Sequence, residues 1–271
     1  MPIAAVNGLE LYYEEHGDSA RPALVCVQGL GGDSSGWAGQ LPLWSQHFRT
    51  IVFDNRDAGR SSYVDDPYDV AVMASDVIGL LDALGVERFH LLGVSLGGAI
   101  AQEVALSAAG RLASLTLIVT YAGADRWFKQ WTKLEESMLV HKSPEHMLEE
   151  LLIMTLSPGF YEDEARIDAL RKEILANPYP QARTGFVHQL RAAATHDSRE
   201  RLGSLAVPTH VIGAEQDLMV PVWRSHELAA LIPGAVLSVV AGSGHSVAAE
   251  QPEELAQLVD SFARAQSAVA A

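Results

Sequence analysis

The chain has 271 residues, 48% of them hydrophobic, and its 34 Asp and Glu against 19 Lys and Arg give a formal net charge of −15. This length is sufficient to bury a large core, while the acidic balance argues against a nucleic-acid partner, whose phosphates would be repelled. The single cysteine, Cys26, excludes an internal disulfide. The N-terminus lacks the basic and apolar regions of a signal peptide, and no apolar run reaches membrane-spanning length. We therefore expect a cytoplasmic protein without a membrane partner.

The first 120 residues alternate between strand-like and helix-like patterns, which is typical of a parallel sheet covered by helices. Short apolar runs predict strands, and apolar residues at helical spacing predict the helices between them. The expected strands are residues 9–15, 23–27, 49–53, 88–92 and 114–119, and the expected helices are 70–84 and 96–109.

Strand signals stop at Tyr121 and return only near Val207. Between them, helical patterns are punctuated by prolines, and an all-helical insert between two αβ portions predicts a lid over a cleft. The expected lid helices are 125–140, 144–156, 162–176 and 181–194, followed by strands 207–213 and 236–240 and a last helix at 253–265. The chain thus divides into a first core part (1–120), a helical lid (121–200) and a second core part (201–271).

The sequence Gly-Val-Ser-Leu-Gly at 93–97 joins a strand pattern to a helix pattern around Ser95. Glycines two residues to each side allow a strand and a helix to approach closely around a strained turn. The serine side chain would then project toward a cleft, above the helix N-terminus. A glycine-rich turn that serves packing alone is the alternative, and the flanking patterns favour the first interpretation.

Two partners for Ser95 follow later in the chain. Asp217 comes just after strand 207–213, and His245 lies in the small-residue loop after strand 236–240. A histidine can take the proton of a serine hydroxyl, and a carboxylate can hold the imidazole in the required tautomer. A solvated carboxylate or a helix cap is the alternative for Asp217, and Asp125, after strand 114–119, is the alternative acid.

Strand 23–27 runs into a glycine-rich loop at 28–36. The backbone amides of Leu30 in this loop and of Leu96, directly after the serine, can converge on a developing oxyanion. An ordinary glycine-rich connection is the alternative. The predicted substrate pocket consists of Gly29, Trp127, Trp131, Met219 and Val220, although the aromatic residues can instead pack the lid helices against the core.

Together these motifs resemble the α/β-hydrolase superfamily, in the lid-bearing branch with small esterases, enol-lactonases and carbon–carbon bond hydrolases. Residues 53–61 resemble its Asp-x-Arg-Gly-x-Gly-x-Ser loop, although Asp57 replaces a glycine, for which the sequence offers no reason. Gln28 stands where the family usually has histidine, and we interpret it as structural. The resemblance implies an α/β fold with a mostly parallel eight-stranded sheet flanked by helices, and an all-helical lid inserted after the sixth strand.

The resulting hypothesis is a serine hydrolase that cleaves a small carboxylic ester or lactone through an acyl-enzyme intermediate. Carbon–carbon bond hydrolysis and cofactor-free perhydrolysis on the same triad are alternatives, and a ligand receptor on this fold is an alternative of another class. Glycine-rich nucleotide motifs and the metalloprotease motif are absent, so we expect neither cofactor nor metal. The expected partner is a small-molecule substrate, and a homo-oligomer is left open.

Overall fold

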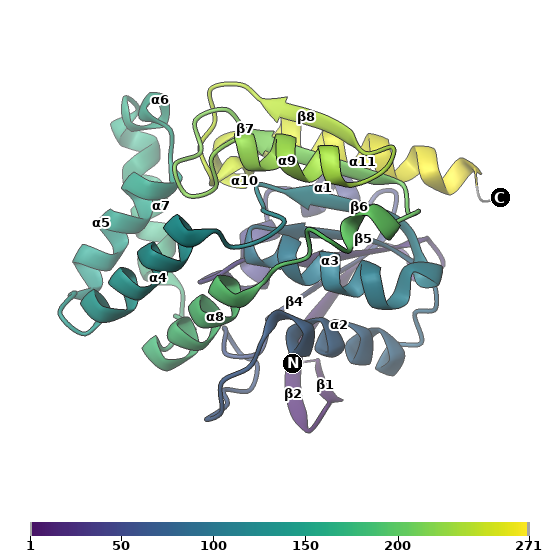
Figure 1. The fold of residues 1–271 in the computed structure, drawn as a ribbon, viewed down its shortest axis with the longest axis horizontal. Coiled ribbons are helices and arrows are strands. Elements are labelled where there is room, and N and C mark those ends of the chain that lie inside the picture. Colours follow the sequence, from purple (N-terminus) through teal and green to yellow (C-terminus); the bar gives the residue numbers. More distant parts are fainter. Residues whose placement is uncertain (1, 270–271) are drawn as a thin grey trace.

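The computed structural model describes residues 2–269, and within them an eight-stranded sheet has the order β1-β2-β4-β3-β5-β6-β7-β8 (Figure 1). β2 runs antiparallel to β1 and β4, and all other neighbours are parallel. The expected mostly parallel sheet is therefore confirmed. The strands are β1 (Ile3–Val6), β2 (Leu9–His16), β3 (Ala23–Val27), β4 (Arg49–Phe53), β5 (Phe89–Val94), β6 (Leu112–Ile118), β7 (Thr209–Ala214) and β8 (Val236–Val240).

The central strands are buried on both faces, which explains their continuous apolar runs. Every residue of β3 and of β7 is buried, whereas β8 at the edge of the sheet is only partly covered. β1 is only four residues long, and it precedes the first predicted strand, residues 9–15. Because β3, β5, β6, β7 and β8 are parallel, their carboxyl ends and the loops that follow lie along one edge of the sheet.

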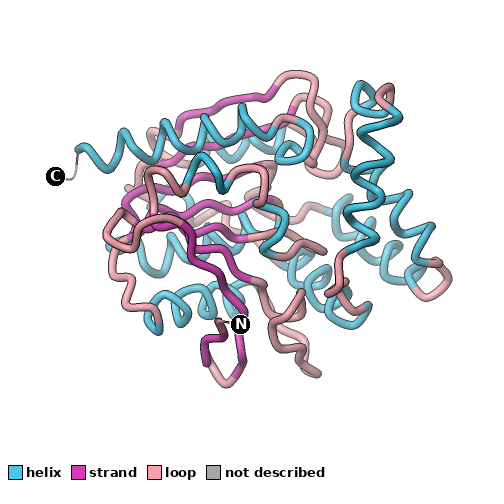
Figure 2. Tube along the Cα trace, turned by 180° about the vertical axis from the view of Figure 1, so that it is seen from behind, coloured by secondary structure: helices cyan, strands magenta, loops and turns pink. Residues whose placement is uncertain are grey.

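Helices cover both faces of the sheet (Figure 2). Residues of α2 (Val70–Ala83), α3 (Leu96–Ala108) and α9 (Trp223–Leu231) share one apolar core cluster with Val25 and Ile51. Residues of α1 (Leu41–Trp44), α10 (Val247–Glu250) and α11 (Pro252–Val269) share a second cluster with Cys26 and Val52. The alternation of neighbouring residues along β3 and β4 between the two clusters follows the pleat of a strand.

The segment between β6 and β7, called the insert below, is helical and lies to one side of the sheet (Figure 1). The predicted helices agree with those observed, except that the third is preceded by a separate short turn of helix at Pro158–Tyr161. The insert has its own small apolar cluster around Leu152 and Phe160. Its helices are α4 (Arg126–Leu139), α5 (Pro144–Thr155), α6 (Pro158–Tyr161), α7 (Glu164–Ala176) and α8 (Arg183–Thr195).

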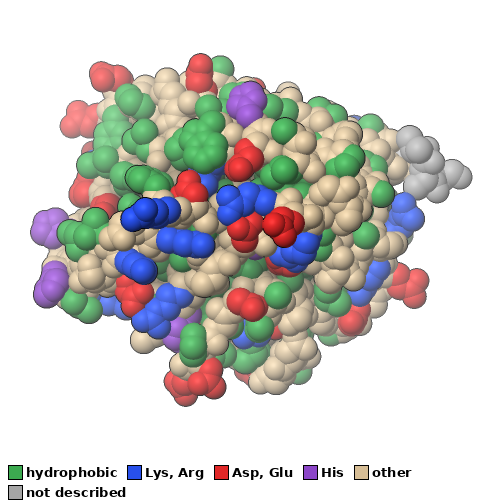
Figure 3. Space-filling view, in the orientation of Figure 1, with side chains coloured by type: hydrophobic (Ala, Val, Ile, Leu, Met, Phe, Trp, Pro, Cys, Tyr) green, Lys and Arg blue, Asp and Glu red, His purple; other side chains and the backbone are tan. Residues whose placement is uncertain are grey.

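Positive side chains gather on one part of this acidic surface. Arg126, Lys129 and Lys133 are exposed at three- and four-residue spacing and therefore share one face of α4. Figure 3 shows Lys and Arg side chains gathered over the same region of the molecule.

None of the helices in the described residues is long and apolar enough to cross a membrane.

Candidate active site

Ser95 occupies a strained turn between β5 and α3. Its backbone has φ 54° and ψ −119°, in the region that residues with a side chain rarely adopt. A Cβ at Gly93 would lie 2.1 Å from Gly97 O, and a Cβ at Gly97 would lie 2.2 Å from Val27 O. The strand and helix therefore approach as closely as the sequence predicts, and both glycines are sterically required.

Two hydrogen bonds join the turn to the end of the neighbouring strand, β6, and to the residues that follow it. Ser95 N donates to Ile118 O at 2.9 Å, and Thr120 Oγ1 donates to Ser95 O at 2.6 Å. These bonds satisfy the backbone of Ser95 and hold the turn in its strained conformation.

His245 and Asp217 meet across the loops that follow β8 and β7. His245 Nδ1 lies 2.7 Å from Asp217 Oδ2, and the Asp217 side chain is fully buried. The other carboxylate oxygen, Oδ1, accepts from the amides of Met219 and Val220, each at 2.8 Å. An ionised carboxylate opposite Nδ1 favours the tautomer that leaves Nε2 free to accept a proton. The hydrogen bonds recorded among residues 2–269 join His245 to Asp217 and not to Ser95, so a Ser95–His245 contact stays a prediction.

Asp125, the alternative acid, has other partners. It caps α4 by accepting from Phe128 N at 2.8 Å, and its second oxygen lies 2.9 Å from Arg224 Nη2. Both carboxylate oxygens are thereby engaged away from His245. The geometry therefore favours Asp217.

The glycine-rich loop after β3 touches the serine turn. A Cβ at Gly29 would lie 3.1 Å from Ser95 Cβ and 3.7 Å from Leu96 N. The loop that carries Leu30 therefore lies against the turn that carries Leu96. In the described part of the chain, the turn and loop hydrogen bonds include none donated by the amides of Leu30 or Leu96. Both amides can therefore act as the pair of donors that the sequence predicts.

Gln28 supports this loop from within. Its buried side chain leaves no space for a side chain at Gly32 or Gly36. A Cβ at Gly32 would lie 2.8 Å from Gln28 Oε1, and a Cβ at Gly36 would lie 2.5 Å from Gln28 Nε2. Gln28 Oε1 accepts from Gly29 N at 3.3 Å, and its carbonyl accepts from Asn55 Nδ2 at 2.9 Å. These contacts agree with a structural role for Gln28.

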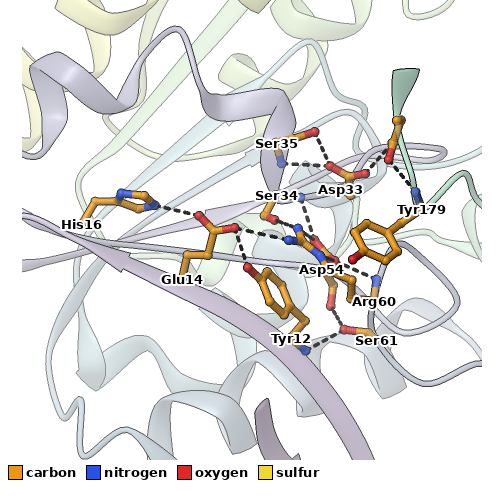
Figure 4. A network of polar contacts seen from close by, with 11 residues as sticks. Tyr12, Glu14, His16, Asp33, Ser34, Ser35, Asp54, Arg60, Ser61 and Tyr179 are labelled. Atoms are coloured by element: carbon orange, nitrogen blue, oxygen red, sulfur yellow. Dashed lines mark hydrogen bonds and ion pairs between the residues drawn. The ribbon is translucent and has the colours of Figure 1, made fainter. Parts of the chain in front are cut away.

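A polar network holds the same loop against β2, the loop after β4 and the insert (Figure 4). Buried Asp54 accepts from Ser34 N at 2.8 Å and from Arg60 N at 2.9 Å. The Arg60 guanidinium lies 3.5 Å from the ring centroid of Tyr12 and 5.3 Å from that of Tyr179. In the sequence, Asp54 and Arg60 are recognisable only as parts of a motif. In the structure, they support the glycine-rich loop after β3.

Three of the predicted pocket residues lie beside the predicted triad. Gly29 contacts the Ser95 turn, and the amides of Met219 and Val220 bind Asp217. Val220 is buried, whereas Met219 is half-buried against the core.

The other two predicted pocket residues lie on α4. Trp131 is half-buried, with its ring centroid 5.7 Å from that of Phe128, and it packs against the core. The Trp127 side chain is 54% exposed. A role for either in a pocket stays a prediction.

Two buried carboxylates near the site have no signal in the sequence that explains them: Glu250, close to His245 in the chain, and Asp57. Glu250 carried no pattern of its own, since it lies near the start of an acidic helix like many exposed glutamates. Within residues 2–269, no group of three or more His, Cys, Asp or Glu side chains could hold a metal ion.

Comparisons with known proteins place this site in a wider context. The sequence model of the family described as "alpha/beta hydrolase fold" matches residues 22–252. "Putative carbamate hydrolase RutD" of Azorhizobium caulinodans is 29% identical over 262 residues, which are 97% of this chain and 98% of the relative. The protein of the same name from Caulobacter sp. (strain K31) is 30% identical over 281 residues, 99% of this chain and 100% of the relative.

Solved structures of other hydrolases have a fold similar to that of this chain. A hydrolase from Pseudomonas aeruginosa PA01 superimposes with a TM-score of 0.87 at 30% identity, covering 96% of this chain and 97% of that one. The enol-lactonase from Burkholderia xenovorans LB400 has a TM-score of 0.87 at 26% identity, covering 96% and 99%. A thermophilic esterase from Thermogutta terrifontis has a TM-score of 0.85 at 26% identity, covering 98% of each chain.

Proposed function

The chain belongs to the α/β-hydrolase fold family and is a hydrolase, and from this premise we propose that it cleaves a small carboxylic ester or lactone with Ser95 as nucleophile. The observation that carries the proposal is the His245–Asp217 pair, formed at the same sheet edge as the strained serine turn. A buried carboxylate bonded to one imidazole nitrogen prepares the other nitrogen to act as a base.

The reaction proceeds in two steps. His245 takes the proton of Ser95 Oγ as this oxygen attacks the substrate carbonyl, and the amides of Leu30 and Leu96 stabilise the oxyanion. The tetrahedral intermediate collapses to an acyl-enzyme, and the leaving alkoxide receives the proton from His245. Water then attacks the acyl group while His245 takes its proton, and the carboxylic acid leaves with Ser95 restored.

The substrate class draws its support from two sources. The enol-lactonase and esterase neighbours match nearly the whole chain at 26% identity. In addition, the amide of Met219 binds Asp217 while its apolar side chain is half-buried, and an apolar residue beside the acid suits an acyl chain or an alcohol.

The first prediction concerns the nucleophile and the base. Ser95→Ala and His245→Ala should each reduce kcat for p-nitrophenyl butyrate by about 10⁶-fold, and Asp217→Asn by about 10⁴-fold. Stopped-flow traces with the acetate, butyrate and octanoate esters and with an aliphatic lactone give both the acylation burst and the steady rate. Asp125→Asn is the matched control and should retain turnover. Turnover of Ser95→Ala near the wild-type rate would contradict the proposal.

A carbamate is the second candidate substrate, because relatives with carbamate hydrolase in their name match 97% and 99% of this chain. The same nucleophile would form a carbamoyl-enzyme, which loses its acyl group more slowly because the nitrogen lone pair weakens the carbonyl as an electrophile. A higher kcat/KM for p-nitrophenyl carbamate than for the acetate would favour this candidate. The reverse order would favour the ester.

A further inference from the structure

Glu250 carries a buried carboxylate that accepts hydrogen bonds from two backbone amides and a hydroxyl. The residue is 4% exposed, at the end of α10. Its Oε1 accepts from Gly244 N at 2.8 Å and from Ser157 N at 3.1 Å, and its Oε2 accepts from the hydroxyl of Ser157. Burying a carboxylate is costly unless its oxygens are hydrogen-bonded, so these three donors hold it in one place.

The three donors come from two segments that are distant in the sequence. Gly244 directly precedes His245, whereas Ser157 belongs to the insert, between α5 and α6. On the other side of the histidine, Ser246 N donates to Thr155 O at 2.8 Å. Both chain neighbours of His245 are therefore linked to the insert segment 155–157.

The two segments are also packed without space between them. A Cβ at Gly244 would lie 2.7 Å from both Ser157 N and Thr155 O. Since these are backbone atoms, the insert rests directly on the histidine loop, and any displacement of one moves the other.

A second part of the insert contacts the end of α10, where Glu250 lies. Arg166 on α7 donates to Glu250 O at 3.2 Å, and its guanidinium lies 4.3 Å from the ring centroid of Phe160. Ser157 Oγ in turn accepts from Phe160 N at 3.2 Å and so caps α6. The insert thus contacts the loop of His245 through segment 155–157, and it contacts the end of α10 through Arg166 of α7.

We propose that Glu250 is a positioning residue for His245. Through Glu250, the position of this base depends on whether segment 155–157 of the insert is packed against the loop that carries it. The catalytic consequence rests on the function proposed above, whereas the structural coupling does not. When segment 155–157 leaves the loop, Glu250 loses both donors of Ser157, and Ser246 N loses Thr155 O. The loop then keeps the bond from Gly244 N to Glu250 and the bond of His245 to Asp217, but His245 is held in position only while segment 155–157 packs against the loop.

The consequence for the rate follows from geometry. A displacement of about 1 Å in a catalytic group can lower the rate about 100-fold, even when its cause is distant from the chemistry. Such a displacement affects the proton transfer more than the binding of a small ester. Loss of Glu250 should therefore lower kcat and leave KM unchanged.

Three variants separate this role from general packing. Glu250→Ala removes all three contacts and should lower kcat about 100-fold at unchanged KM. Glu250→Gln keeps an oxygen for the two amides and presents an NH₂ group to Ser157 Oγ, so it should restore most of the rate. Glu253→Ala removes an exposed carboxylate one turn away and serves as the matched control, with wild-type kcat expected.

A spectroscopic measurement tests the coupling without any substrate. The low-field proton resonance of His245 Nδ1–H, assigned by its absence in His245→Gln, reports the bond to Asp217. It should shift or broaden in Glu250→Ala and in Ser157→Ala, and remain in Glu250→Gln and Glu253→Ala. Ser157→Ala removes only a hydroxyl and serves if Glu250→Ala does not fold.

The outcomes distinguish this inference from the proposed function. If esters are not hydrolysed but the resonance responds as stated, the positioning role stands and the ester hydrolase proposal fails. If esters are hydrolysed and Glu250→Ala or Ser157→Ala leaves both kcat and the resonance unchanged, the positioning role is overturned. Loss of thermal stability in Glu250→Ala with kcat unchanged below the transition also overturns it, because packing alone then explains the residue.

Discussion

Two strained residues lie side by side at the ends of neighbouring strands. Ser95 after β5 has φ 54°, and Val119 after β6 has φ 42°, an unusual value for a β-branched side chain. Such conformations cost on the order of 1–3 kcal/mol each and persist only where the surroundings enforce them. Here Val119 N donates to Ile212 O at 2.8 Å, and the bonds of Ser95 to β6 complete the arrangement.

At this scale, Gly97→Ala should destabilise the fold, because the new Cβ would meet the backbone of Val27 at 2.2 Å. Overpacking of this kind costs about 1–3 kcal/mol, and backbone atoms cannot rotate away. Urea unfolding followed by circular dichroism measures the difference. Gly203→Ala, where a Cβ would meet nothing within 4 Å, is the control. Equal midpoints for the two variants would show that the turn can relax.

At the scale of the elements, Asp57 connects α8 to the core; its presence in place of a glycine was unexplained by the sequence. Asp57 has φ 61° and is buried, and its Oδ1 accepts from Val64 N at 2.8 Å. Its Oδ2 lies 2.9 Å from His188 Nδ1 on α8, and its carbonyl accepts from Gln181 Nε2 at 2.7 Å. The side chain that replaces a glycine thus attaches the end of the insert to the loop after β4.

Asp57→Gly should loosen α8 without straining the loop. Glycine adopts the positive φ freely, while the contacts with Val64 and His188 are lost. We expect faster amide hydrogen exchange in α8 and unchanged exchange in α3, measured by mass spectrometry. Asp57→Asn keeps an acceptor for Val64 N and tolerates the backbone conformation, so it should exchange more slowly than Asp57→Gly. Identical protection of α8 in both variants and in the wild type would contradict this anchoring role.

Across the whole molecule, two neutral histidines are buried under α11. His90 on β5 bonds to Ser114 and Ser267, and His210 on β7 bonds to Ser238. Burial lowers the pKa of His210 to about 4. Burial together with the charge of Arg88 lowers the pKa of His90 to about 4. Burial therefore favours the neutral form of both imidazoles in the folded chain.

The stability of the whole molecule should consequently fall on acidification. Each histidine has a lower pKa in the folded chain than its unfolded value of about 6.5, so its contribution is complete above pH 6.5 and is lost as the pH falls toward 4. The loss reaches about 3 kcal/mol for each imidazole. Urea unfolding from pH 7 to 4.5 should show this decline, and His210→Gln should flatten it. The exposed His146→Gln is the control, and a wild-type curve with no slope would refute the assignment.

Local patterns were sufficient for much of the fold. Apolar runs predicted β3 and β7, and helical spacing predicted α2, α3 and most of the insert, because these elements bury residues with the period of their own backbone. The glycines around Ser95 also predicted the strained turn, because Gly93 and Gly97 approach each other within five residues, although the contact of Gly97 with Val27 appears only in the fold. The four-residue β1 was missed because so short a strand has too few residues to show a period.

The sequence by itself determined most of the strands and helices, the serine turn, and the chain order of Ser95, Asp217 and His245. Only the tertiary structure decided the roles of Asp57 and Glu250, because their partners are 131 and 93 residues away. No periodicity connects residues so far apart. A buried carboxylate is defined by the donors that surround it, and those donors are brought together only when the insert folds onto the core.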